Sequence, residues 1–326
     1  MINAAIVGIG NWGKVLVSSV QNNSSVTFTK GVTRTKSKAV EFCATNDIEI
    51  VDDYDTLLAD PSIDAIVLAT PHTQHAGQIV AAAEAGKHVF AEKPYTLSKS
   101  DAEVALAAVK KAGVKTAVGL NRRFAPNFQK IKAMIQDGTL GEPIQIEGHF
   151  SANLALKDAW RSDPSESPAG GMTSLGIHIV DAFISMFGPI SEVRAYSKSL
   201  VTSYDIDDTT RILFEFENGR TGYFGSVTGT STLTYLRAFG TGGWASVNNA
   251  NELSFAPIGG QPETEYWDGY AHPALKTIGA GLDAFAADIE GGAPFPVSPN
   301  QILHGVAVLD AIFRSINSGK VEVPKS

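Results

Sequence analysis

Apolar residues in the first third of the chain fall into short runs that alternate with helical patterns. The runs 4–7, 64–70 and 116–120 predict buried strands, and alanine and valine recur at helical spacing over 101–112. Further strands are expected over 26–33 and 88–91, and further helices over 12–20, 36–45 and 73–85. Such alternation is typical of a parallel sheet covered on both faces. We therefore expect an α/β fold that begins with a doubly wound Rossmann domain.

The pattern changes after about residue 141. Polar and apolar residues alternate over 144–150 and 212–216, which predicts half-buried strands, and Asn218-Gly219 predicts a hairpin leading to a return strand at 223–228. Further strands are expected over 233–239 and 244–247 in the same sheet. Helices near 173–187, 274–290 and 301–317 are expected to pack on this sheet. We expect an α+β domain with a large, mostly antiparallel open sheet. The domains are placed at 1–121 and 122–326.

Charge and cysteine content limit the kinds of partner. The 326-residue chain has a net charge of −8 and no Lys/Arg-rich run, which argues against broad contact with nucleic acid or an anionic membrane. Cys43 is the only cysteine, so no intramolecular disulfide can form, and core packing is expected for it. No basic segment precedes the apolar start, and no apolar run approaches about 20 residues. A cytoplasmic protein is expected.

A glycine-rich turn follows the first predicted strand and opens a helix. Its residues are Gly8, Ile9, Gly10, Asn11, Trp12 and Gly13, a G-x-G-x-x-G pattern. Gly8 permits the tight turn, Gly10 lets the backbone approach a pyrophosphate, and Gly13 allows close packing of helix and strand. The helix N-terminus adds free N–H groups. This context favours dinucleotide binding over an ordinary glycine-rich turn.

The end of the second predicted strand bears on the choice of cofactor. NAD-preferring sites usually carry Asp or Glu there for the adenosine ribose. This chain has Thr33 and Arg34 instead, followed by Lys36, and an arginine fork suits a 2′-phosphate. We expect NADP to be preferred over NAD. The alternative is that Arg34 and Lys36 are solvated loop charges.

Lys93 follows the predicted strand 88–91, at the edge where parallel sheets bind ligands. Oxidation of an alcohol by a nicotinamide requires a group that accepts the hydroxyl proton. A lysine can do so if burial and the cationic ring lower its pKa.

These motifs together resemble the glucose–fructose oxidoreductase / inositol dehydrogenase / rhizopine catabolism (Gfo/Idh/MocA) family. The shared segments, in chain order, are 8–13, Ala69-Thr70-Pro71-His72 with His75, Glu92-Lys93-Pro94, 119–124, Trp160-Arg161, Gly170-Gly171 and 176–181. The resemblance implies a Rossmann domain followed by a domain with a large open sheet, through which members commonly form homodimers or homotetramers. It also implies an NAD(P)-dependent dehydrogenase or reductase of a sugar, cyclitol or keto-sugar.

The resemblance also implies roles for individual residues. Lys93 would donate or accept the proton, and Asn121 would lie near the nicotinamide. Positions implied to contact or frame the cofactor are Thr70, Pro71, His72, His75, Glu92, Lys93, Asn121, Trp160 and Arg161. Positions implied to contact the substrate are Lys93, Arg122, Trp160, Ser174 and His178. Arg122 and Arg123 either bind substrate or close the domain interface.

One position departs from the family pattern. Many catalytic members carry Asp four residues before the histidine, where this chain has Ser174. A serine cannot supply charge, so His178 would be a weaker base, a substrate-binding donor or a core histidine, and Lys93 would carry more of the proton transfer. His178 and Asp181 are too few ligands for a metal site, so none is expected, and Asp181 is expected to be a structural hydrogen-bond partner.

Two other functions fit the same motifs. The first is a glycoside-processing enzyme that retains its cofactor and uses transient oxidation. The second is a regulator that binds dinucleotide or sugar without catalysis, which the loss of Asp at position 174 mildly favours and the presence of Lys93 and His178 disfavours.

Overall fold

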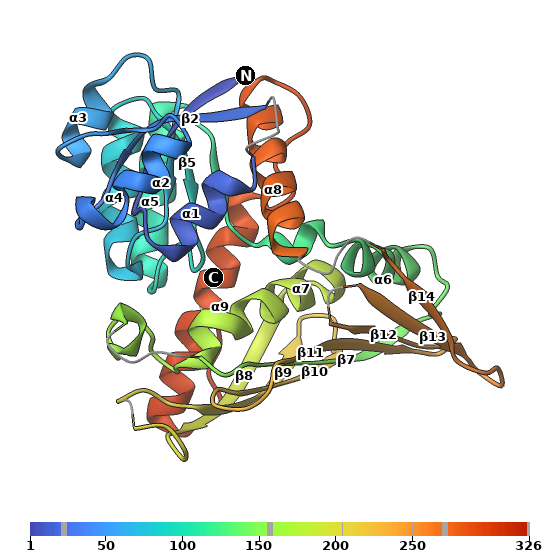
Figure 1. The fold of residues 1–326 in the computed structure, drawn as a ribbon. Coiled ribbons are helices and arrows are strands. Elements are labelled where there is room, and N and C mark those ends of the chain that lie inside the picture. The colour runs from blue at the N-terminus through green and yellow to red at the C-terminus, as the bar shows by residue number, and fades with distance from the viewer. Residues whose placement is uncertain (21–24, 155–158, 204, 250, 269–272, 325–326) are drawn as a thin grey trace. The chain divides into compact units, whose positions relative to one another are not determined.

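The computed structural model describes residues 1–326 except 21–24, 155–158, 204, 250, 269–272 and 325–326. The chain forms two compact units (Figure 1). The first comprises Met1–Asn121 and Ala274–Leu303, and the second comprises Arg122–Pro273 and His304–Ser326. The sequence analysis placed one boundary after residue 121. The compact units share that boundary, but residues 274–303 return to the first unit.

The first unit contains a parallel sheet, as predicted, with six strands, of which the short β3 (Glu49–Ile50) was not predicted. The strand order is β3-β2-β1-β4-β5-β6, the order of a dinucleotide-binding fold. The strands are β1 (Ile2–Val7), β2 (Val26–Val32), β3 (Glu49–Ile50), β4 (Ala65–Leu68), β5 (His88–Ala91) and β6 (Thr116–Val118). All four residues of β4 are buried because helices cover both faces, and this explains its unbroken apolar run.

Helices connect these strands, and local capping sets several of their ends. Ser98 accepts a hydrogen bond from Asp101 N at 3.1 Å at the start of α5, and Gly113 ends this helix with a φ of 68°. The helices are α1 (Asn11–Ser18), α2 (Val40–Thr45), α3 (Tyr54–Ala59), α4 (His75–Glu84) and α5 (Lys99–Ala112), with short 3₁₀ turns η1 (Lys36–Lys38) and η2 (His72–Gln74). Cys43 is buried in α2, as expected for core packing.

Helix α8 (Pro273–Ile289) completes the core of the first unit. The Phe90 ring on β5 meets the Phe285 ring at 5.8 Å and the Phe295 ring at 6.5 Å, both edge-on. The sequence analysis assigned this helix to the second sheet, and that prediction was wrong. Helical periodicity defines which face is apolar, but it does not say which apolar surface will cover that face.

The second unit contains an eight-stranded sheet with the order β14-β13-β12-β11-β7-β10-β9-β8. Every neighbouring pair is antiparallel except β7 and β10, which are parallel, so the sheet is mostly antiparallel, as predicted. The strands are β7 (Pro143–Ser151), β8 (Ile190–Lys198), β9 (Thr209–Phe216), β10 (Thr221–Val227), β11 (Leu233–Gly240), β12 (Gly243–Asn248), β13 (Glu252–Pro257) and β14 (Glu263–Tyr266). The predicted hairpin joins β9 to β10, and Gly219 there has a φ of 78°.

Helices cover one face of this sheet. They are α6 (Pro126–Gln136), α7 (Ile177–Phe187) and the part of α9 (Pro299–Ser318) that belongs to this unit. Glycines allow close approach, since a Cβ at Gly148 on β7 would lie 2.5 Å from Ile179 of α7. Ser315 Oγ of α9 accepts a hydrogen bond from the backbone N–H of Ala195 on β8 at 2.9 Å, which joins this helix to the sheet. No helix in the described part of the chain is long and apolar enough to cross a bilayer.

Candidate active site

The glycine loop after β1 closes tightly. Gly8 has a φ of 95°, and a Cβ there would lie 2.6 Å from the carbonyl oxygen of Ala69. A Cβ at Gly13 would collide with the carbonyl oxygen of Gly8. Only glycine fits these two positions, so the loop brings the start of α1 directly against the ends of β1 and β4.

The same loop leaves room for a ligand at Gly10. A Cβ at Gly10 would meet no other atom within 4 Å. Gly10 stands at the N-terminus of α1, where no side chain caps the helix, so its first N–H groups face an open region. The buried indole N–H of Trp12 also has no acceptor among the described residues. Free donors beside open space fit the pyrophosphate of a dinucleotide.

The end of β2 carries an exposed cation. Arg34 is exposed and makes no hydrogen bond or ion pair with any described residue. Lys36 is different, because its Nζ lies 2.5 Å from Oδ1 of Asp52. Arg34 is therefore the residue at this point with its fork available to a ligand.

His75 ties together the loops that follow β4 and β5. The buried imidazole places Nδ1 2.9 Å from the carbonyl oxygen of Pro94 and Nε2 3.2 Å from that of Thr70. A neutral ring donates to one carbonyl at a time, and a protonated ring donates to both. The ring also stacks edge-on against buried His72 at 5.9 Å. The contacts of His75 with the carbonyls of Pro94 and Thr70 hold the segment that carries Lys93 beside the Thr70 segment.

Glu92 is buried directly before Lys93, with 6% of its surface exposed. Its backbone N–H donates to Leu68 O at 2.9 Å, which extends the pairing of β5 with β4. A Cβ at Gly119 would lie 2.5 Å from Glu92 Oε1, so this glycine makes room for the carboxylate. The arrangement places a buried carboxyl group one residue before the partly exposed Lys93, and Glu92 Oε2 accepts from the Lys93 backbone N–H at 3.3 Å.

Asn121 ends the first unit and is fixed by α8. Its Nδ2 donates to Thr277 Oγ1 at 2.8 Å, and Thr277 is 2% exposed. Sequence reasoning did not find Thr277, because no motif surrounds it and it lies 156 positions away.

In the second unit, His178 is the second residue of α7, which follows directly after a π-helical turn, η5 (Met172–Gly176). His178 and Ser174 are each 7% exposed. A π turn holds more residues than an α turn, so the four-residue spacing from Ser174 to His178 does not complete one turn here. A Cβ at Gly176 would lie 2.7 Å from the Phe224 ring, so this glycine lets the turn rest on the sheet.

Arg123 and Asp181 form a buried ion pair. Arg123 Nη2 lies 2.7 Å from Asp181 Oδ1, and the two side chains are 6% and 9% exposed. Asp181 is therefore a structural hydrogen-bond partner, as expected. The sequence left open whether Arg123 binds substrate or closes the domain interface. In the structure its guanidinium donates to Asp181 and Ser185, both on α7.

Asp208 organises the chain that runs beside the π turn. Its carboxylate accepts hydrogen bonds from the backbone N–H groups of Leu200 at 3.0 Å, Val201 at 2.7 Å and Thr202 at 2.8 Å. Burial alone would raise the pKa of Asp208, but these bonds outweigh it and lower the pKa to about 2. A Cβ at Gly170 would collide with Asp207 O, so the segment entering η5 lies against this loop. The sequence analysis missed Asp208.

Trp160 and Arg161 lie in a short 3₁₀ turn, η4 (Trp160–Ser162). The Arg161 guanidinium carbon stacks 4.2 Å from the Trp160 ring centre. Lys93 belongs to the first unit, and Trp160, Arg161 and His178 belong to the second.

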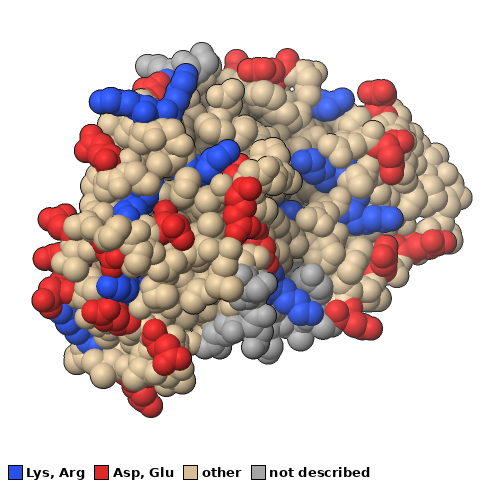
Figure 2. Space-filling model, turned by 90° about the horizontal axis from the view of Figure 1, so that it is seen from above, with Lys and Arg blue, Asp and Glu red and all other residues tan. Residues whose placement is uncertain are grey.

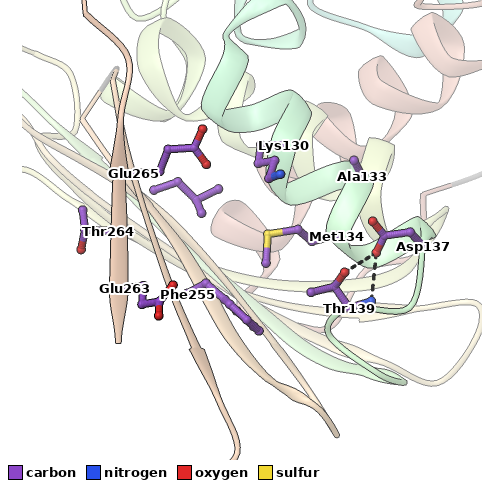
Figure 3. A pocket seen from close by; sticks show the side chains of 10 residues that line it. Lys130, Ala133, Met134, Asp137, Thr139, Phe255, Glu263, Thr264 and Glu265 are labelled. Carbon is purple, nitrogen blue, oxygen red and sulfur yellow. Dashed lines mark hydrogen bonds between the residues drawn. The ribbon is translucent and has the colours of Figure 1, made fainter. Parts of the chain in front are cut away.

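A groove of about 320 Å³ lies elsewhere in the second unit, between α6 and the strands β13 and β14 (Figure 3). Asp137 at its rim accepts hydrogen bonds from Thr139. The residues that line it are Lys130, Ala133, Met134, Asp137, Thr139, Leu253, Phe255, Glu263, Thr264 and Glu265, and none is a predicted site residue. Among the described residues, no three His, Cys, Asp or Glu side chains form a group that could hold a metal ion.

Sequence comparison matches both units to one family. Residues 2–120 match the oxidoreductase family with an NAD-binding Rossmann fold, and residues 128–246 match the Gfo/Idh/MocA C-terminal domain. The oxidoreductase YrbE of Bacillus subtilis (strain 168) is 33% identical over 76% of this chain and 74% of its own length. The chain belongs to the Gfo/Idh/MocA oxidoreductase family.

Two further relatives span nearly the whole chain. Inositol 2-dehydrogenase of Rhizobium meliloti (strain 1021) is 26% identical, with 97% of both chains covered. The solved structure of levoglucosan dehydrogenase in complex with NADH and levoglucosan has a TM-score of 0.89 and 22% identity, covering 99% of this chain and 100% of that one. The second likeness shows that the two-unit fold is shared.

Proposed function

We propose that this oxidoreductase is an NAD(P)-dependent dehydrogenase or reductase of a sugar, cyclitol or keto-sugar. The observation that carries the proposal is the open space at Gly10 beside free helix N–H groups, in a unit that also holds Lys93 next to buried Glu92. The named activities of the inositol and levoglucosan enzymes support this substrate class.

The first unit would hold the dinucleotide at the carboxyl ends of β1, β2, β4 and β5. The loop Gly8–Gly13 would bind the pyrophosphate, Arg34 a 2′-phosphate, and the Thr70–His72 segment would flank the bound molecule. A nicotinamide supplies the hydride donor or acceptor when it is bound.

Lys93 is the proposed proton donor and acceptor. Its Nζ would take the hydroxyl proton of the substrate during oxidation and return it during reduction. The ring nitrogens of His75 lie within hydrogen-bonding distance of the carbonyl oxygens of Pro94 and Thr70, and these contacts fix the backbone that carries Lys93. Glu92 Oε2 accepts a hydrogen bond from the backbone N–H of Lys93 at 3.3 Å, which also helps to fix this backbone.

His178 is the proposed second polar contact to the substrate hydroxyls. Ser174 can donate or accept a hydrogen bond near it but supplies no charge, so an imidazolium gains little support from this position. We propose that His178 mainly orients the substrate, with Trp160 and Arg161 closing over the reacting end, and that Lys93 carries the proton transfer.

NADP is the proposed preferred cofactor. Arg34 is exposed with its fork unused by the described residues, and no carboxylate follows β2 directly. Asp52 lies beside Lys36 and reduces the positive charge there, so the preference rests on Arg34.

Purified protein with NAD⁺ or NADP⁺ and a panel of sugars and cyclitols tests the proposal by the absorbance of the reduced nicotinamide. We expect turnover with at least one compound and a lower KM for NADP⁺. In Arg34→Ala the affinity for NADP⁺ should fall about tenfold while that for NAD⁺ holds. Failure of both dinucleotides to bind would refute the function, and a retained cofactor without net turnover would favour the glycoside-processing alternative.

We also propose that a second copy of the chain packs on the open face of the eight-stranded sheet, giving a homodimer or homotetramer. Tyr235 stacks on His149 at 5.8 Å on this face, and Arg237 lies 5.3 Å from the Trp244 ring centre. Exposed Leu213 lies on the same face. Aromatic and arginine side chains of this kind are enriched in protein interfaces. The face drawn in Figure 2 instead mixes Lys and Arg with Asp and Glu.

A further inference from the structure

Arg122, the first residue of the second unit, holds its charge against aromatic rings. It lies in the short turn η3 (Asn121–Phe124) and is partly buried. Its guanidinium carbon is 5.4 Å from the centre of the Phe150 ring and 5.8 Å from that of Phe128. Burial lowers the pKa of Arg122 to about 10, so the side chain stays cationic at neutral pH.

No acid in the described part of the chain neutralises this cation. The Arg122 side chain makes no hydrogen bond to a described residue, and no described carboxylate lies within 4.0 Å of it. The neighbouring Arg123 shows the contrast, because its donors are taken by Asp181 and Ser185. Aromatic faces attract a cation but leave its N–H donors unused, and a desolvated cation is costly without an anion.

The position of Phe150 relates Arg122 to the turn that carries His178. Gly148 faces α7, and Phe150 is two residues further along the same face of β7. The carbonyl oxygen of Phe150 accepts a hydrogen bond from Ser226 Oγ at 2.8 Å. A Cβ at Gly171, directly before η5, would lie 3.1 Å from that same Oγ. Arg122 therefore lies at the end of β7 where the π turn begins.

We propose that Arg122 binds an anionic group of the substrate, so that the preferred substrate is an acidic sugar or cyclitol derivative bearing a carboxylate or a phosphate. The inference rests on the proposed function, because it places this cation in the substrate site of the same enzyme. A guanidinium fork matches both groups through two parallel hydrogen bonds. The rings of Phe128 and Phe150 pack against the guanidinium and reduce its contact with water, which strengthens a hydrogen bond to an anion.

Isothermal titration of the full-length protein, with NADPH present, tests this directly. The probes are D-glucuronate, D-glucose 6-phosphate, inorganic phosphate and uncharged D-glucose. Arg122→Gln is compared with Arg220→Gln as a matched control, since Arg220 also lies over a phenylalanine ring, at 5.7 Å from Phe187, but at the opposite end of β10. Arg122→Lys keeps the charge without the fork and serves as a second variant if Arg122→Gln does not fold.

We expect at least one anion to bind more tightly than D-glucose, with a loss on the order of 10- to 100-fold in Arg122→Gln and none in Arg220→Gln. Binding of D-glucuronate indicates recognition of a carboxylate, and binding of D-glucose 6-phosphate or inorganic phosphate indicates recognition of a phosphate. The inference is overturned if no anion binds, if D-glucose binds as tightly as the anions, or if Arg122→Gln and Arg122→Lys bind them like wild type. Turnover of neutral sugars alone would refute this inference and support the proposed function. Arg122-dependent anion binding without any turnover would do the reverse.

Discussion

Arg123 donates two parallel hydrogen bonds to the carboxylate of Asp181. Nε donates to Oδ2 and Nη2 donates to Oδ1, each at 2.7 Å, and Nη1 donates to Ser185 Oγ at 2.9 Å. Asp181 stands three residues after His178 on α7, whereas Arg123 belongs to η3. The pair therefore fixes the rotation of α7 about its axis and, with it, the direction in which His178 points.

Asp181→Asn should destabilise the second unit by about 3 kcal/mol, because it leaves the Arg123 charge buried without a partner. Urea unfolding at pH 7, monitored by circular dichroism, measures the loss. The double variant Arg123→Met/Asp181→Leu should recover most of it, since it removes both charges together. A single variant as stable as wild type would contradict the structural role of the pair.

Lys93→Met should bind NADP⁺ normally but reduce kcat by about 10²- to 10⁴-fold, because no other proposed residue can exchange the hydroxyl proton as directly. Steady-state kinetics and cofactor titration by nicotinamide fluorescence separate the two effects. Lys110→Met, at an exposed position on α5, is the control and should be fully active. Wild-type turnover in Lys93→Met would eliminate Lys93 as the proton carrier.

Gly10→Ala and Gly13→Ala should fail in different ways. A Cβ at Gly10 meets nothing within 4 Å, so the protein should fold with an unchanged melting temperature but bind the dinucleotide more weakly. A Cβ at Gly13 collides with Gly8 O, so that variant should lose stability even without ligand. Normal cofactor affinity in Gly10→Ala would show that the pyrophosphate does not occupy this space.

Asp208→Asn should cost on the order of 2–3 kcal/mol at pH 7, because a pKa near 2 in the folded state lies well below the unfolded value of about 3.9. A depressed carboxyl pKa stabilises the fold above the unfolded pKa, and this contribution disappears as pH falls through the folded pKa. The difference between variant and wild type should therefore be halved near pH 3 and small near pH 2. Guanidinium unfolding at these pH values provides the comparison, and a pH-independent difference would contradict the assignment.

Local patterns predicted the architecture well where one chain segment determined the answer. The runs around β1 and β4 and the turn from Gly8 to Gly13 specify a parallel sheet through burial and backbone sterics alone. The Asn218-Gly219 hairpin follows from a positive φ that glycine adopts freely.

Contacts between distant segments could not be read from such patterns. Thr277 reaches Asn121 across 156 positions, and Asp208 uses three backbone N–H groups that carry no sequence pattern. The π turn before His178 was also missed, because an extra residue in a helical turn leaves the surrounding apolar spacing nearly unchanged.

The return of α8 to the first unit has a consequence for synthesis on the ribosome. Phe90 is covered by Phe285 and Phe295, which are translated about two hundred residues later. Part of the apolar surface of the nascent Rossmann sheet therefore stays uncovered until most of the polypeptide has emerged from the ribosome. During that interval this surface is a natural binding site for chaperones, and a ribosome stalled before residue 274 would leave a sheet that cannot complete its interior.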